Sequence, residues 1–304
     1  MGRYRIISLD GGGIKGLIMV IILERLERAV PGFLAKVDFF AGTSTGGLLA
    51  LGLAYGKSLT EARKLYEERG KEVFSDSLVD EVRDLGSLVG ADYDTGPLKE
   101  ALADEFGTTR LSELPKNVLV SAFDLDRQLE GIPSLRSWKA KFFHNFPGPE
   151  SDGNETVVDV GLFTSAAPTY FPIYKGFIDG GVVACNPSVC ALAQALHQPT
   201  GGQALDDIVL LSLGTGRNPR YVDSLDGDWG LIQWAPQLVH LVMEGSTDLA
   251  DYQCRQILRE RYLRLNPLLP YPIGMDRVNQ IPLITKIADQ FPLDGAISWL
   301  KEYF

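Results

Sequence analysis

Two short glycine-rich segments near the start of the chain carry residue types that could cleave an ester. Residues 10–16 read Asp-Gly-Gly-Gly-Ile-Lys-Gly and residues 42–46 read Gly-Thr-Ser-Thr-Gly, and each segment follows an apolar run. A serine in the second segment could act as a nucleophile, and successive glycine amides in the first could bind a negatively charged oxygen. A third segment, residues 179–181, reads Asp-Gly-Gly and supplies the carboxylate that such a serine would need.

The first glycine segment predicts an oxyanion hole formed by Gly11, Gly12 and Gly13, with Lys15 adding positive charge at its rim. Its backbone N–H groups would converge at the start of a helix, where the helix dipole favours negative charge. Together with Gly16 the segment also matches the Gly-x-Gly-x-x-Gly pattern of dinucleotide-binding proteins. That alternative requires an acidic residue at the end of the second strand, where this chain has a glycine, a threonine and a serine. The oxyanion interpretation is therefore favoured.

Ser44 is the candidate nucleophile. A Gly-x-Ser-x-Gly sequence between an apolar strand and an apolar helix is the context of a nucleophile elbow. Gly42 and Gly46 would be needed because side chains at these positions would collide in so sharp a turn. The alternative is that the serine only caps the helix that follows.

The chain contains three histidines, and none of them is favoured as the base that activates the serine. His240 lies in an apolar helical stretch that is typical of a core residue, and His197 is at a helix end, where capping explains it. His144 precedes a Pro-Gly loop and has no acidic partner nearby in the sequence. A Ser-His-Asp triad has no positive support.

Asp179 is the preferred base, because it leaves a short strand and the chain then turns through Gly180 and Gly181. If all three segments follow strands of one parallel sheet, they emerge at the same carboxyl edge, where open α/β sheets bind their ligands. A carboxylate bonded directly to a serine in a dry pocket can act as a general base. The sequence thus predicts a Ser44–Asp179 dyad.

The elements that must position these residues alternate between strands and helices. Strands are expected at residues 4–9, 37–41, 117–123, 208–213 and 262–265. Helices are expected at residues 17–29, 48–55, 60–74, 187–197 and 248–261. This alternation predicts an α/β fold with a mainly parallel sheet and helices on both faces, formed by a single domain spanning residues 1–304.

Composition excludes several classes of function. The chain has 304 residues, is 45% hydrophobic and carries a net charge of 29 − 39 = −10, which argues against binding a nucleic-acid polymer. No His-Glu-x-x-His or similar ligand cluster occurs, so neither a metal nor a cofactor is expected. The apolar run at residues 17–23 is too short to cross a bilayer, and three cysteines without a Cys-x-x-Cys pattern are typical of a reducing compartment. We therefore expect a cytoplasmic protein.

The motifs taken together resemble those of the patatin-like phospholipases. The likeness extends to Thr-Ser-Ala-Ala-Pro-Thr-Tyr-Phe at residues 164–171 and to Ser-Leu-Gly-Thr-Gly at residues 212–216, and covers about residues 6–265. It implies a three-layer α/β/α fold and metal-independent hydrolysis of acyl esters of membrane lipids. It also implies Ser44 as nucleophile and Asp179 as base, with a core at about residues 4–265 and a C-terminal extension at 266–304.

The same resemblance assigns Gly12, Gly13 and Lys15 to the oxyanion region, where the family usually has Arg in place of Lys. Lysine keeps the charge but loses the planar guanidinium, so it cannot bond in a bidentate manner.

Three further functional questions follow from the resemblance. The chain is also similar to bacterial lipid-degrading effectors, so a small-molecule activator is left open, as are a homo-oligomer and a non-catalytic binding role. Residues 226–234, which contain Trp229 and Trp234, could form an apolar lid in transient contact with a membrane surface, or could simply pack on the domain.

Overall fold

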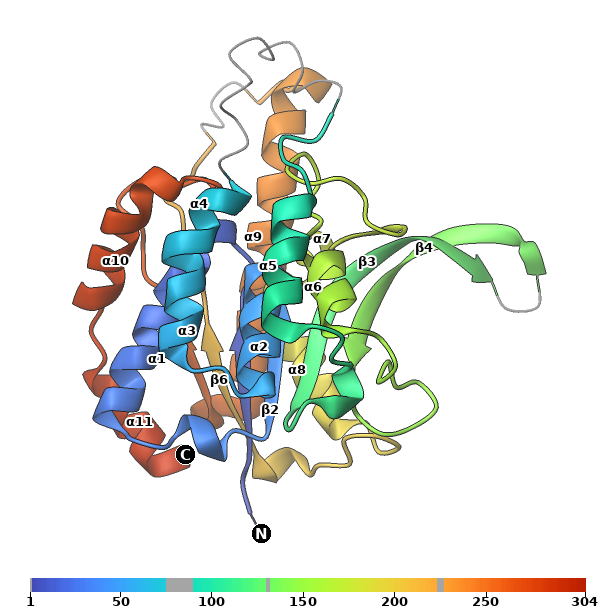
Figure 1. Cartoon of the computed structure of the whole chain (residues 1–304). Helices are drawn as coiled ribbons and strands as arrows, with labels where there is room; N and C mark the ends of the chain where they lie inside the picture. The colour runs from blue at the N-terminus through green and yellow to red at the C-terminus, as the bar shows by residue number, and fades with distance from the viewer. Residues whose placement is uncertain (1, 75–89, 130–131, 223–226) are drawn as a thin grey trace.

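The computed structural model describes residues 2–74, 90–129, 132–222 and 227–304. Within these residues one seven-stranded sheet has the order β4-β3-β2-β1-β6-β7, with β5 also paired to β3 (Figure 1). The strands are β1 (Tyr4–Leu9), β2 (Phe39–Thr43), β3 (Asn117–Leu129), β4 (Ile132–His144), β5 (Phe177–Asp179), β6 (Ile208–Leu213) and β7 (Tyr262–Leu265).

Helices connect most of these strands. The α-helices are α1 (Leu17–Ala29), α2 (Thr45–Tyr55), α3 (Leu59–Lys64), α4 (Gly70–Val73), α5 (Gly96–Phe106), α6 (Val157–Ser165), α7 (Gly181–Ala184), α8 (Ser188–Leu196), α9 (Leu231–Leu258), α10 (Ile281–Gln290) and α11 (Asp294–Tyr303). Two shorter segments matter for the site: a 3₁₀ turn η1 (Gly13–Gly16) and a π-helical segment η3 (Leu65–Arg69). No helix in the described ranges is long and apolar enough to cross a membrane.

The predicted mainly parallel sheet is confirmed. β1 pairs in parallel with β2 and β6, β2 with β3, and β6 with β7. The expected bounds of β1, β6 and β7 are those observed, whereas β2 lies two residues later than expected, at Phe39–Thr43. This shift brings the end of β2 directly to Ser44.

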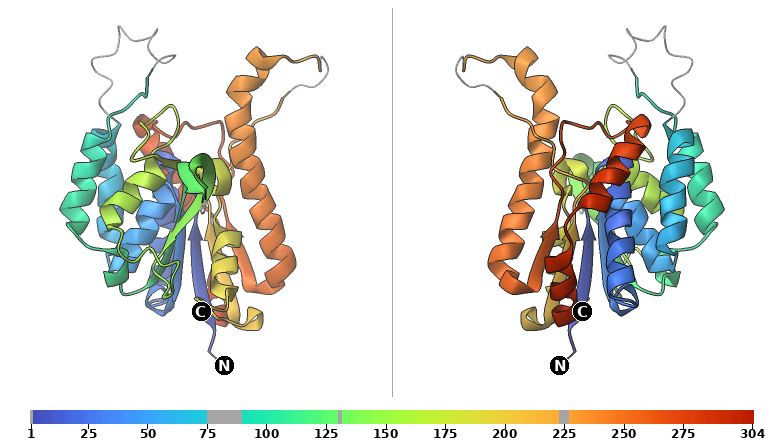
Figure 2. Two further views of the ribbon diagram at one scale, coloured as in Figure 1. Left: turned by 90° about the vertical axis from the view of Figure 1, so that its right-hand side faces the viewer. Right: turned by 90° about the vertical axis from the view of Figure 1, so that its left-hand side faces the viewer.

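Helices cover both faces of the sheet, as expected for three layers (Figure 2). Because successive side chains of a strand point to opposite faces, Ile7 packs in the core with α1, α2 and α5, while Ile6 packs with α8 and α9 on the other side. Both faces are therefore buried, which explains why the central strands are continuously apolar.

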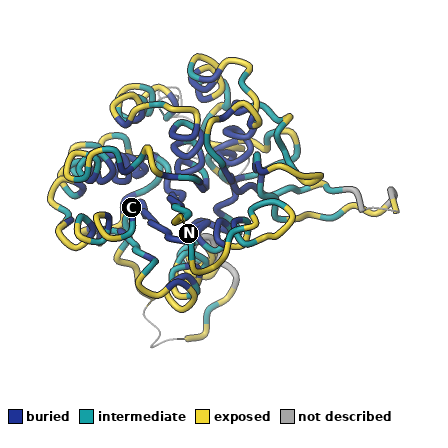
Figure 3. Tube along the Cα trace, turned by 90° about the horizontal axis from the view of Figure 1, so that it is seen from below, coloured by how far each residue is buried: buried dark blue, intermediate teal, exposed yellow. Residues whose placement is uncertain are grey.

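The hairpin of β3 and β4 was not predicted. β3 continues beyond residue 123 and pairs antiparallel with β4, and the two strands project from the body of the protein. Figure 3 shows the central strands buried and this arm intermediate or exposed. Ile132, Leu135 and Trp138 are at least half exposed. A strand pair that faces solvent lacks the apolar run by which the central strands were found.

Two other segments differ from expectation in length or role. α9 begins at Leu231 rather than at residue 248. Of the predicted lid at residues 226–234, residues 231–234 therefore form the first turn of α9 and residues 227–230 precede it, while Asp226 lies outside the described residues. The C-terminal segment 266–304 packs into the main core, where Ile284 and Leu300 are fully buried against the α1 layer.

Candidate active site

Ser44 lies at a sharp turn between β2 and α2. Its φ of 53° and ψ of −126° are unfavourable for a residue with a side chain. A Cβ atom at Gly42 would lie 2.1 Å from the carbonyl oxygen of Gly46, and one at Gly46 would lie 2.2 Å from the carbonyl oxygen of Leu9. The turn is therefore compatible only with glycine at both flanking positions, and it has the strand–turn–helix form of a nucleophile elbow.

The threonine that holds this turn in place was not identified from the sequence. The backbone N–H of Ser44 donates to Oγ1 of Thr164 at 2.7 Å, and the same hydroxyl donates to the carbonyl oxygen of Ser121 at 2.6 Å. Thr164 thereby links the end of α6 to the turn and to β3. Its position within the 164–171 motif was the only sequence signal for this role.

Asp179 reaches the serine by a route that differs from the expected one. β5 runs antiparallel to β3, so the expectation that all three motifs leave parallel strands is wrong for this residue. β2 pairs with β3 as far as Thr43 opposite Ser121, and β5 then takes the same edge of β3 with Asp179 opposite Ala122. The ends of β2 and β5 consequently meet head to head, which brings Ser44 and Asp179 together.

The Asp179 carboxylate is buried, with 5% of the residue exposed. Its Oδ1 accepts the N–H of Gly181 at 2.7 Å, and Ser44 lines the same cleft. Burial raises the pKa of Asp179 to about 6, and the Ser44 side chain and the Gly181 N–H oppose the shift. Gly180 precedes α7 as its N-cap residue. A pKa near 6 favours the ionised form of this carboxylate at neutral pH.

The glycine segment presents two free amides rather than three. The N–H of Gly11 donates to the carbonyl oxygen of Cys185 at 3.0 Å, so the expected oxyanion role of Gly11 is not compatible with the structure. Gly12 precedes η1 and Gly13 is its first residue. The backbone N–H groups of both have no acceptor among the described residues. A Cβ at Gly12 would lie 2.2 Å from Oγ1 of Thr215, which itself donates to the Gly11 carbonyl.

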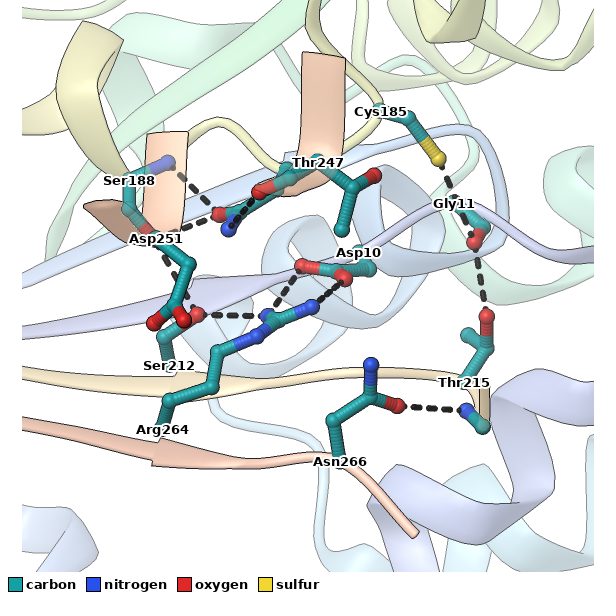
Figure 4. Close-up of polar contacts among 12 residues, drawn as sticks. Asp10, Gly11, Cys185, Ser188, Ser212, Thr215, Thr247, Asp251, Arg264 and Asn266 are labelled. Atoms are coloured by element: carbon teal, nitrogen blue, oxygen red, sulfur yellow. Dashed lines mark hydrogen bonds and ion pairs between the residues drawn. The ribbon is translucent and has the colours of Figure 1, made fainter. Parts of the chain in front are cut away.

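A buried ion pair anchors the start of this loop (Figure 4). Arg264 of β7 forms a bidentate contact with Asp10, in which one Nη1–Oδ1 distance is 2.8 Å, and the same nitrogen donates to Ser212 at 2.7 Å. Both side chains are at most 6% exposed. Burial raises the pKa of Asp10, and the Arg264 guanidinium opposes that shift. The residues are 254 positions apart, and nothing in the sequence indicated that they pair.

Lys15 points to the same region but has no hydrogen-bond or ion-pair partner in the described part of the chain. The residue is 5% exposed, and burial lowers its pKa to about 8. Gly16 ends η1 beside Thr45 and Tyr66, whose hydroxyls are 2.5 Å apart. Lys15 is therefore available to an anionic ligand, and Gly16 allows η1 to approach α2.

Two cavities meet at Ser44. The first, a polar cleft of about 450 Å³, is lined by Asp179, Lys15, Arg217 and Arg220, among others. The second, an apolar cavity of about 160 Å³, lies between helices on one side of the sheet. A bound molecule with one polar and one apolar part could therefore contact Ser44 at their junction.

The structure corrects the interpretation of one histidine. His240 lines the polar cleft and is not a core residue, and its pKa is lowered mainly by burial and further by Arg220 and Lys15. His144 is buried, and Nδ1 of His197 lies 3.0 Å from the Thr200 hydroxyl at the end of α8. Within the described ranges, no histidine hydrogen-bonds to the serine or to its carboxylate partner.

Comparison with known proteins gives one family. The family model described as patatin-like phospholipase matches residues 7–188. Protein teg of Priestia megaterium is 29% identical over 99% of both chains. A cGAMP-activated phospholipase of Pseudomonas aeruginosa is 33% identical over 86% of this chain and 78% of its own. Among solved structures, VipD from Legionella pneumophila matches 96% of this chain and 67% of its own with a TM-score of 0.42 and 12% identity.

Proposed function

The chain belongs to the patatin-like phospholipase family, and we propose that it hydrolyses fatty-acyl esters of lipids through a Ser44–Asp179 dyad. The observation that carries the proposal is the position of Ser44 beside the buried Asp179 carboxylate in one cleft, where the serine side chain acts to lower the pKa of that carboxylate. That carboxylate lines the same cleft as Gly12, and the amides of Gly12 and Gly13 have no acceptor among the described residues. A base must come within hydrogen-bond reach of the proton that it removes, and the meeting ends of β2 and β5 bring these two residues together.

In the first half of the reaction, Ser44 Oγ attacks the ester carbonyl and its proton passes to Asp179. The negative charge that develops on the carbonyl oxygen is stabilised by the amides of Gly12 and Gly13. Such donors contribute through electrostatics, and the loss of one typically costs about 3 kcal/mol of transition-state stabilisation. The proton on Asp179 then passes to the leaving alcohol, which departs and leaves an acyl-enzyme.

In the second half, a water molecule attacks the acyl group while Asp179 takes one of its protons. Collapse of this second tetrahedral intermediate breaks the ester to Ser44, and the proton on Asp179 returns to the serine oxygen. The products are a fatty acid and an alcohol, and the dyad is restored.

The polar cleft favours a lipid with an anionic head group. The residues that line it include the carboxylates of Glu244 and Asp248 and three cations, Lys15, Arg217 and Arg220. A phosphate placed here would gain charge-assisted hydrogen bonds from these three cations, which have no ion-pair partner in the described residues. We therefore propose phospholipids rather than neutral acylglycerols as substrates.

Labelling and turnover of matched variants test the dyad. A fluorophosphonate probe is expected to label the wild-type protein at Ser44, and Ser44→Ala is expected to lose labelling and at least roughly 10³-fold of its lipid hydrolysis. Ser298→Ala, at an exposed position of α11, is the control and keeps both. Equal hydrolysis by wild type and Ser44→Ala, measured by mass spectrometry on phospholipids and triacylglycerols, would refute the proposal.

We also propose that the first half of α9 contacts the lipid surface. Trp234, Leu238, Leu241 and Val242 are 38% to 51% exposed and follow helical spacing on one face. Other residues of the same helix, including Met243, line the cleft. The helix extends beyond the carboxyl end of the sheet (Figure 1). A lipid bound by this apolar face would lie beside the entrance to the site.

A second candidate function is a phospholipase that works only when a small molecule binds. The Pseudomonas aeruginosa relative named above is a cGAMP-activated phospholipase, and the free cations of the cleft suit a phosphate ligand. Hydrolysis by the purified chain without additions, unchanged by cyclic GMP–AMP, would exclude this candidate.

A further inference from the structure

We propose that the apolar cavity beside Ser44 holds the acyl chain of the scissile ester and that the ion pair at its far end sets the preferred chain length. The inference rests on the proposed hydrolysis at Ser44 and adds to it the part of the substrate that the cavity selects.

Three helical segments form the walls of the cavity on one face of the sheet. Leu48 and Leu49 of α2 face it, as do Leu98 and Leu102 of α5. The π-helical segment η3 and α4 close the third side with apolar residues such as Val73. Almost no polar surface is exposed inside, so an acyl chain would lose its contact with water there without leaving a polar group unpaired.

The mouth of the cavity is at the reacting atoms. Ser44 lies at the start of α2 and is shared with the polar cleft, as are Ala167, Tyr170 and Met275. When the carbonyl carbon of an ester lies at Ser44 Oγ, its head group can therefore extend into the polar cleft and its acyl chain into the apolar cavity. One cavity is polar and the other apolar, which matches the polar head group and the apolar acyl chain of a phospholipid.

The opposite end is closed by charged side chains. Lys57 Nζ lies 2.6 Å from Oε2 of Glu105, and both side chains are partly exposed. This pair joins the chain just beyond α2 to the last turn of α5. A methylene chain that reached them would have to displace or desolvate an ion pair, which is unfavourable.

The distance between mouth and end favours a chain of intermediate length. Gly52 is the last residue of α2 that lines the cavity, and eight residues of helix separate it from Ser44, or about 12 Å at 1.5 Å per residue. A medium-length acyl chain fits this space in an extended form. Longer chains would meet the Lys57–Glu105 pair.

Two substitutions should shift the selectivity in opposite directions. A Cβ at Gly52 would meet only Lys57, at 3.9 Å, so Gly52→Leu fits the backbone and fills the end of the cavity. We expect kcat/KM for a dodecanoyl ester to fall about tenfold, the equivalent of roughly two buried methylenes, with acetyl and butyryl esters changed less than about twofold. Lys57→Ala opens the end and should raise the ratio of palmitoyl to octanoyl turnover.

Control variants separate selectivity from stability. Gly295→Leu makes the same change on α11, where nothing lies near the added side chain, and Lys141→Ala removes a partly buried ion pair remote from the cavity. Both are expected to keep the wild-type chain-length profile. A Gly52→Leu profile parallel to that of wild type, on esters that wild type does hydrolyse, would overturn the inference.

Binding of a fatty acid distinguishes this inference from the dyad proposal. Calorimetry with dodecanoate and the Ser44→Ala protein should show one site, weakened about tenfold by adding Gly52→Leu. Dodecanoate binding by a protein that hydrolyses no ester would refute the proposed function and leave the cavity assignment standing. Unchanged binding in the double variant would refute the cavity assignment.

Discussion

The two ionisable residues beside Ser44 should give the reaction a bell-shaped pH profile. The pKa of Asp179 is raised to about 6, so its base form is lost as the pH falls below that value. The pKa of Lys15 is lowered to about 8, so its positive charge is lost as the pH rises above that value. We expect kcat/KM on an uncharged soluble ester to be highest between these two limits.

Lys15→Arg is the variant that assigns the alkaline limb of this profile. Arginine keeps its charge at any pH used in such an assay, so the alkaline decrease should disappear while the acidic limb stays near pH 6. An alkaline limb that remained unchanged in Lys15→Arg would mean that another group titrates there.

Asp179 also predicts a conflict between activity and stability. Its pKa is 3.8 in the unfolded reference and about 6 when folded, so the ionised form is less stable in the folded protein. Stability is lost as the pH rises from 3.8 to about 6 and then stays constant, by about 3 kcal/mol in total. Asp179→Asn should therefore unfold at higher urea concentration than wild type at pH 7.5, while losing hydrolysis.

The comparison at low pH is the internal control for that prediction. Below the reference pKa of 3.8 both proteins are neutral at this position, so the difference in the free energy of unfolding should disappear. If the asparagine variant were equally stable or less stable at pH 7.5, desolvation would not dominate the energetics of this carboxyl group.

Single residues were predictable from the sequence where local backbone geometry demands them. Ser44 and its flanking glycines follow from steric rules that act within five residues. Thr164 and Arg264 were not predictable, because each acts through a contact with a segment more than a hundred positions away. The prediction for Gly11 failed for the same kind of reason. Its N–H was expected to be free, but it donates to the carbonyl oxygen of Cys185 at the C-terminal end of α7.

At the scale of elements, the Asp10–Arg264 pair ties β1 to β7 and fixes the start of the glycine loop. Removing one partner leaves a buried charge unpaired, which typically costs 3–5 kcal/mol. We expect Arg264→Gln to lower the free energy of unfolding by about that amount. The double variant Asp10→Asn/Arg264→Gln should recover most of the loss, as measured by urea unfolding.

An exposed ion pair provides the control for this cycle. Arg136 and Asp126 of the β3–β4 hairpin are 61% and 45% exposed, so Arg136→Ala should change stability by less than about 1 kcal/mol. A cost for Arg264→Gln that is equally small would show that the ion pair does not anchor the loop.

The direction of strands was the element-level property that the sequence could not supply. Buried parallel strands such as β1 and β6 were found from their apolar runs. β5 has only three residues, and nothing in Phe177–Asp179 indicates that it runs against its neighbour. Its pairing is decided by the free edge of β3 beyond the end of β2, which is a property of the assembled sheet. The sequence analysis thus expected Ser44 and Asp179 to lie close together, but on the incorrect assumption that both follow parallel strands.

At the scale of the whole molecule, a protein with a net charge of −10 must reach a substrate that lies in a lipid phase. Its overall charge does not favour an anionic surface, so contact must come from apolar groups. Such groups occur on α9 beside the cleft and also on the hairpin arm, where Trp138 is 73% exposed. Exposure alone therefore does not tell which of the two surfaces meets the membrane.

Position relative to the site decides between them, and paired variants test the decision. α9 lines the cleft, whereas β4 lies at the edge of the sheet. Trp234→Ser/Leu241→Ser should weaken binding to phosphatidylcholine vesicles at least about tenfold, because each exposed side chain loses roughly 1–2 kcal/mol of burial in the lipid. Turnover of a soluble acetyl ester should stay unchanged.

Trp138→Ser, the matched control, should bind vesicles as wild type does. Weaker binding in the Trp138 variant alone would place the lipid contact on the hairpin, and loss of soluble-ester turnover in the α9 variant would show that its side chains support the cleft instead.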